Sequence, residues 1–216
     1  MIRETLFYKI LSAVHIVLFT SMLCFGTIYL SGTLLMMPVL GAAFKIGKDA
    51  IYKDLDINDS IVKTYIRYLK SSFKLVKFIP INFIIFINVA GMLIAAGAKN
   101  MMYSVICLVL ISFLLVFMLY IAGYYVFVDE QVSIIDVLYS ILLKPQYLLP
   151  VFIIMVLSVF FLSGKLLAVL FFCGAFFLYA LIIVIFIQML FYKKALGKLE
   201  DEDKFAYLIN RQGKKR

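Results

Sequence analysis

Long runs without a charged residue constrain the fold of this chain more than any other feature. Between Ile10 and Phe44, a stretch of 35 residues, the one side chain able to carry a charge is His15. Four further runs contain no charged residue and are 20 to 28 residues long: Ile79–Ala98, Met101–Val128, Pro145–Gly164 and Leu166–Tyr192. About 20 apolar residues in a helix cross the hydrocarbon core, and a helix satisfies its own backbone polar groups there. The sequence therefore predicts an all-α integral membrane protein.

The first apolar run is too long for one crossing, and Gly26, Ser31, Gly32 and Pro38 interrupt it. We divide it into a span from Ile10 to Leu30 and a shorter segment from about Thr33 to Phe44. If the shorter segment crosses fully, the fold is a polytopic transmembrane helical bundle of six membrane segments, with residues 1–192 as one domain. If it is re-entrant or lies in the interface, there are five.

The distribution of basic residues predicts the orientation. Of the 21 Lys and Arg residues, eight lie between Lys45 and Lys77 and eight between Lys193 and Arg216. Basic residues beside spans mark the cytoplasmic side and suit an anionic leaflet, so we expect a cell-membrane protein that does not bind nucleic acid. Four predicted spans separate the two basic regions. Both regions, including the tail 193–216, are therefore expected in the cytoplasm.

A basic amphipathic helix is predicted over residues 57–78. Its cations recur at intervals of four and three residues, as on one face of a helix, and Asp59 or Ser60 can cap its first turn. The cations are Lys63, Arg67, Lys70, Lys74 and Lys77, with Ile61, Tyr65, Leu69, Phe73 and Val76 on a neighbouring face. Such a helix suits lipid headgroups or an acidic partner, although a solvated connecting helix has the same pattern. Gln131–Leu143 predicts a second, less charged amphipathic helix at the interface.

The residues that carry catalysis or bind metals are sparse. The chain has one histidine, no P-loop and no GxGxxG, and its cysteines, Cys24, Cys107 and Cys173, form no close pair. We therefore expect no enzyme activity, no metal site and no cofactor. Within the spans, Asn82 and Asn88 could line a polar cavity, although such residues more often join helices by hydrogen bonds.

The segment from Met37 to Lys77 resembles the YesL-like family of bacterial membrane proteins. The resemblance lies in a Pro-x-x-Gly-x-Ala turn, matched by Pro38, Gly41, Ala42 and Ala43, and in the aromatic and basic run Tyr65–Lys77. It implies a Gram-positive cell-membrane protein often encoded beside carbohydrate ABC importers. It carries over no catalytic residue.

Two functions remain open on the sequence. The first is a non-enzymatic accessory protein that binds a partner, such as a subunit of a carbohydrate ABC transporter or a second copy of the chain, within the membrane lipids. The alternative is a small transporter or channel for an uncharged or lipid-like solute. The alternative predicts a cavity that contains Asn82 or Asn88.

Overall fold

The computed structural model describes the backbone of residues 6–52, 60–153 and 167–198, and the side chains of 14–52, 60–153 and 177–198. All regular structure in these ranges is helical, which confirms the predicted all-α class. The elements are α1 (Leu6–Leu30), α2 (Met36–Tyr52), α3 (Ile61–Ser71), η2 (Ser72–Phe78), α4 (Ile79–Gly97), α5 (Met101–Phe127), α6 (Ile134–Leu143), η3 (Pro145–Tyr147) and α8 (Leu167–Ala195).

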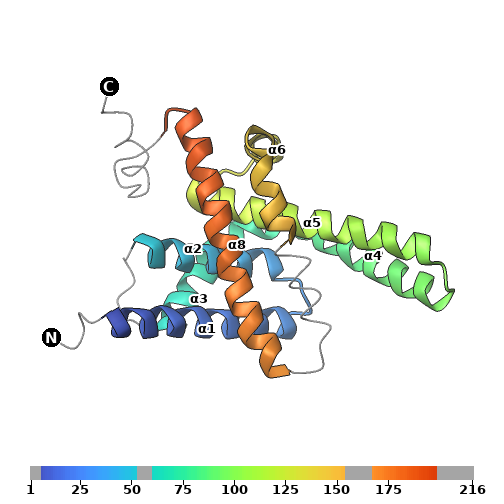
Figure 1. The fold of residues 1–216 in the computed structure, drawn as a ribbon, viewed down its shortest axis with the longest axis horizontal. Coiled ribbons are helices and arrows are strands. Elements are labelled where there is room, and N and C mark those ends of the chain that lie inside the picture. Colours follow the sequence, from blue (N-terminus) through green and yellow to red (C-terminus); the bar gives the residue numbers. More distant parts are fainter. Residues whose placement is uncertain (1–5, 53–59, 154–166, 199–216) are drawn as a thin grey trace.

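The core forms where α2 meets the second half of α5. Every residue from Met118 to Phe127 is buried, and on α2 the side chains of Met37, Ala43 and Phe44 are inaccessible to solvent. Helices α1, α3 and α8 pack around this centre, with α8 crossing α1 and α5 (Figure 1). A helix that is apolar on every face is stable where neighbours cover all its faces, which is the situation of this half of α5.

Glycines permit the closest of these helix contacts. A Cβ placed on Gly123 of α5 would lie 2.4 Å from Cγ2 of Ile185 on α8, and one on Gly41 of α2 would lie 2.8 Å from Cδ1 of Leu75 in η2. Both distances are shorter than carbon atoms tolerate. The absence of a side chain at these two positions therefore sets the spacing of α5 from α8 and of α2 from η2.

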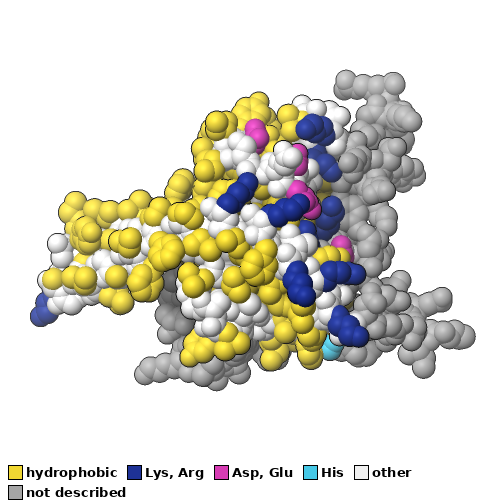
Figure 2. Space-filling view, turned by 180° about the vertical axis from the view of Figure 1, so that it is seen from behind, with side chains coloured by type: hydrophobic (Ala, Val, Ile, Leu, Met, Phe, Trp, Pro, Cys, Tyr) yellow, Lys and Arg dark blue, Asp and Glu magenta, His cyan; other side chains and the backbone are white. Residues whose placement is uncertain are grey.

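The α4–α5 hairpin extends away from this core (Figure 1). Its two helices meet along Gly91, Ala95 and Cys107, which agrees with the small-residue spacing of Gly91 and Ala95 in the sequence. Large apolar side chains cover the rest of its surface; Phe86, for example, is 67% exposed. In Figure 2 the protruding hairpin is almost wholly hydrophobic, whereas the charged side chains, apart from those at its tip, gather on the opposite part of the molecule.

The structure supports fewer spans than six. Among the described residues, three helices are long and apolar enough to cross a membrane. They are the continuous helix Ile61–Gly97, which ends with α4, then α5, and α8 from Phe177. A fourth candidate is present if α6 and the helix Pro145–Ile153, which meet at 89°, are counted as one bent span. The predicted spans 79–98, 101–128 and 166–192 correspond to α4, α5 and α8. The second half of Pro145–Gly164 lies outside the described residues.

The segment predicted from about Thr33 to Phe44 forms the first part of a longer helix. A turn at residues 31–35 precedes it, at the predicted division between Leu30 and Thr33, and Gly32 and Thr33 have positive φ values of 57° and 71°. Helix α2 then continues past Phe44 to Tyr52. It lies in the core because α1, α3 and α5 cover its apolar half.

We predict that Gly123→Ala lowers the free energy of unfolding by about 1–3 kcal/mol, because its Cβ would overlap Ile185 and force α5 from α8. The measurement is thermal unfolding in detergent. The control is Gly26→Ala in α1, where no atom lies within 4 Å of the added Cβ. This change should be neutral or stabilising, since alanine favours helix. Equal melting temperatures for the two variants would contradict the packing.

Candidate functional site

The predicted basic helix is present, but it changes type halfway. Residues 61–71 form α3 with Ser60 at its N-cap position, although the Ser60 side chain makes no capping hydrogen bond, and residues 72–78 form the 3₁₀ helix η2. Asp59 and the start of the predicted range lie outside the described residues. Because a 3₁₀ helix has three residues per turn, the expected single face is broken at Ser72.

This change of helix type corrects the predicted apolar face. Tyr65 is buried, as expected, but Phe73 is 47% exposed, and Leu75 and Phe78 take the buried positions instead. The five cations all remain exposed, yet they fall into two groups. Lys74 and Lys77 turn toward the loop after α5: Lys74 pairs with Glu130, and Lys77 Nζ donates to the carbonyl of Val132 at 3.1 Å.

The remaining three cations, Lys63, Arg67 and Lys70, lie on the exposed side of α3, and we call them the outer stripe. The Arg67 guanidinium lies 5.1 Å from the centre of the Tyr68 ring. Within the described part of the chain, Lys63 and Lys70 form no ion pair. No Asp or Glu occurs between Ile61 and Phe78, so no carboxylate within this segment offsets their charge.

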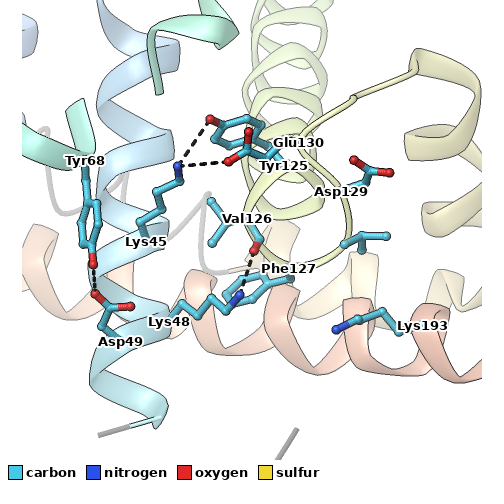
Figure 3. A pocket seen from close by; sticks show the side chains of 11 residues that line it. Lys45, Lys48, Asp49, Tyr68, Tyr125, Val126, Phe127, Asp129, Glu130 and Lys193 are labelled. Carbon is cyan, nitrogen blue, oxygen red and sulfur yellow. Dashed lines mark hydrogen bonds and ion pairs between the residues drawn. The ribbon is translucent and has the colours of Figure 1, made fainter. Parts of the chain in front are cut away.

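A polar network that the sequence did not predict joins α2, α3, η2 and α5. We call it the Lys45–Glu130 network; it consists of Lys45, Ser71, Lys74, Tyr125 and Glu130. Lys45 Nζ donates to Ser71 Oγ at 3.0 Å. It also donates to the Tyr125 hydroxyl at 3.4 Å and lies 3.9 Å from Glu130 (Figure 3). Tyr125 in turn donates to the Ser71 carbonyl at 2.8 Å.

Electrostatics favour the charged form of Glu130 in this network. The hydrogen bond from Lys74 lowers the pKa of the Glu130 carboxyl, and the charges of Lys74 and Lys45 act in the same direction. Burial lowers the pKa of Lys45, while the nearby Glu130 carboxylate opposes that shift. Glu130 is therefore the shared anion that holds the α3–η2 segment against the end of α5.

A pocket of about 400 Å³ opens beside the network between α2, α5 and α8 (Figure 3). Three lysines line it, Lys45, Lys48 and Lys193, and three carboxylates face them, Asp49, Asp129 and Glu130. Their charges offset one another. Lys48 Nζ donates to the Val126 carbonyl at 3.4 Å, and Asp49 accepts a hydrogen bond from Tyr68. These contacts join the helices, and the pocket presents no net charge to a ligand.

The four residues expected to form a turn lie within α2. Pro38 occupies its first turn, where a missing N–H is tolerated, and Gly41, Ala42 and Ala43 follow in the buried interior of the helix. The absence of a side chain at Gly41 lets η2 approach α2, since a Cβ there would overlap Leu75. The motif therefore serves packing, and the turn itself precedes it.

Two polar residues of the predicted spans, Asn82 and Gln188, bond to other elements, whereas Asn88 bonds within its own helix. Asn82 Nδ2 donates to the carbonyl of Thr33, in the turn between α1 and α2, at 3.1 Å. Asn88 Nδ2 donates to Ile84 of its own helix at 2.8 Å. Neither asparagine lines the pocket beside the network or a second pocket of about 740 Å³ near α6. Buried Gln188 accepts from Tyr120 and donates to the Ser140 carbonyl of α6 at 3.1 Å.

Sequence reasoning missed the network because its members are distant in the chain and are of common residue types. The available signal was the spacing of Lys45, Lys48 and Asp49, which places three charges on one side of a buried helix. Among the described residues, no three His, Cys, Asp or Glu side chains come together as a metal site.

Comparison of the chain with protein-family models, curated proteins and solved structures finds no match.

We predict that Glu130→Gln destabilises the fold at neutral pH by removing the anion shared by Lys74 and Lys45. Because the pKa of Glu130 is lower in the folded state, its ion pairs stabilise the fold fully above the unfolded-state pKa, about 4.3. They stop doing so as the pH falls through the folded-state value. The measurement is thermal unfolding against pH for both proteins. If the two proteins already had the same melting temperature at about pH 5, the lowered pKa of Glu130 would be contradicted.

Proposed function

We propose that this protein is a non-enzymatic accessory protein of the cell membrane that binds a membrane-protein partner through the outer stripe of α3. The observation that carries the proposal is the division of the five cations. Lys74 and Lys77 are bonded to the loop after α5, so their ammonium groups already have partners within the protein. The three cations of the outer stripe are exposed, and the segment that carries them contains no carboxylate to offset their charge.

A cationic stripe of this kind favours an acidic surface. Surface charges steer association and select the partner more than they add affinity, and they act over about 10 Å at moderate salt. Residues 61–78 run directly into α4, so the stripe is attached to a candidate span and stays close to the membrane. An acidic cytoplasmic face of another membrane protein would meet it there.

The membrane arrangement that we propose has five crossings. They are α1, α4, α5, the run that begins at Pro145, and α8. Helix α2 is left out because Lys45 divides it and its uncharged part, residues 36–44, is shorter than the roughly 20 residues that a crossing requires. With four crossings between the two basic regions, α3 and the tail after Ala195 both lie in the cytoplasm.

The resemblance to the YesL-like family supports one class of partner, a carbohydrate ABC importer. It rests on the segment from Met37 to Lys77, whose basic part is the same α3–η2 segment that presents the outer stripe. The α4–α5 hairpin, whose outer surface is mostly apolar away from its tip, would place the protein in the bilayer beside the importer's own helices.

The test is a pull-down from mild detergent with mass spectrometry of what is recovered. We predict that Lys63→Glu/Arg67→Glu/Lys70→Glu lowers recovery of the partner about tenfold relative to the unchanged protein, the effect of losing several weak charge contacts together. Its expression should be unchanged and its melting temperature nearly so, since the stripe makes no ion pair within the described chain and loses only the exposed contact of Arg67 with the Tyr68 ring.

The matched control is Lys99→Glu, a charge reversal in the turn at the tip of the hairpin, far from α3. Recovery with this variant should equal that of the unchanged protein. A partner retained by the triple variant would refute the stripe as the contact. Recovery of the protein alone in every case would refute the accessory function itself.

A further inference from the structure

Helix α6 exposes an apolar face. Ile134, Ile135, Leu138 and Leu142 are all exposed, Ile135 by 76% and Leu142 by 71%. At about 100° per residue these four side chains share an arc of about 100° on the helix surface. Ile141, which lies next to this arc, packs against the core. The exposed arc thus contains aliphatic side chains alone, with the ring of Tyr139 at its edge.

The opposite side of α6 is fixed to the bundle. Val137 and Ser140 are fully buried, and the Gln188 amide of α8 donates to the carbonyls of Ser140, Ile141 and Lys144 at 3.1, 3.5 and 3.5 Å. These carbonyls belong to the end of α6, where a helix leaves its acceptors without partners. The helix cannot rotate to hide its apolar arc without breaking this contact.

The direction of α6 relative to the next helix limits where it can lie. With ten residues it is about 15 Å long, half the hydrocarbon thickness, so it cannot cross. It meets the helix Pro145–Ile153, which opens an uncharged run, at 89°. In Figure 1, α6 points nearly along the line of sight, whereas α8 and the hairpin lie across the view. A ten-residue helix that turns by 89° into the start of an uncharged run suits a position along the membrane plane.

We infer that α6 is an interfacial helix whose arc of Ile134, Ile135, Leu138 and Leu142 lies among the lipid acyl chains of one leaflet. That leaflet is on the side of η2, because Lys77 donates to Val132 just before α6. Lipid is the occupant that the chemistry favours. The arc carries no charge or hydrogen-bonding group of its own, and the chain enters a long uncharged run directly after Lys144. This inference does not depend on the proposed partner.

The residues at the ends of the helix fit this position. The Lys144 ammonium lies 5.7 Å from the centre of the Phe191 ring, at the corner where α6 gives way to the next helix. Tyr139 and Tyr147 lie on either side of that corner and pack against Tyr192 and Phe191 of α8. Lysine and tyrosine together are typical of the headgroup level, where an apolar stem and a polar tip are both satisfied.

The experiment attaches a fluorophore to α6 and measures which quenchers, in water or in lipid, reduce its fluorescence. Single cysteines are introduced as Ile135→Cys and Leu142→Cys in a chain carrying Cys24→Ala, Cys107→Ala and Cys173→Ala, labelled with an environment-sensitive dye and reconstituted in phosphatidylcholine–phosphatidylglycerol vesicles. Asp136→Cys, on the side that faces the pocket near α6, is the matched control. Quenching is compared between iodide in the water and nitroxides at a shallow or deep position on the lipid chains.

Labels at 135 and 142 should be quenched several-fold more by the shallow nitroxide than by the deep one or by iodide, as for a helix about 5–10 Å below the headgroup boundary. The label at 136 should respond to iodide. Iodide quenching at 135 and 142 would overturn the inference, because the arc would then face water. Protection from all quenchers would also overturn it, because protein rather than lipid would cover the arc.

Discussion

The burial of the second half of α5 is the constraint on which the rest of the structure depends. Ten consecutive residues, Met118 to Phe127, are buried on every side of the helix, which requires neighbours all round. Helix α2 supplies one neighbour and α8 another, and Gly123 permits the close approach of α8. Tyr120 and Tyr125 extend polar contacts from this centre, the first to Gln188 and the second to Lys45 and Ser71. The core, the Lys45–Glu130 network and the position of α6 all meet here.

The same helix illustrates what could be predicted from the sequence. The span Met101–Val128 was placed almost to the residue, because a long uncharged run between turn residues leaves helix as its one stable form in lipid. Both halves lack a charged residue, yet residues 101–113 are mostly exposed whereas Met118–Phe127 is buried. Hydropathy alone does not distinguish burial in protein from burial in lipid. For that reason the sequence left open whether the segment from Thr33 to Phe44 crosses the membrane, and the structure shows that this segment packs at the centre of the bundle as part of α2.

The candidate site was predicted in part for a related physical reason. The spacing of the five cations identified the exposed positions from Lys63 to Lys77 correctly, since helical periodicity fixes which side chains share a surface. The change from α3 to η2 was not predictable from spacing, and it divides the cations between internal bonds and the outer stripe. The Lys45–Glu130 network was not predicted either, because its partners meet through the packing of four separate elements. Pairings of this kind depend on the fold as a whole.

The central claim of this account is that the basic α3 and the tip of the apolar hairpin lie on opposite sides of a membrane. Cysteine accessibility in intact cells tests it most directly, with Lys70→Cys on α3 and Lys99→Cys at the tip, both in the chain without other cysteines. A membrane-impermeant maleimide should label position 99 in intact cells and position 70 after permeabilisation alone. Equal labelling of the two positions before permeabilisation, or labelling of position 70 alone, would contradict the claim.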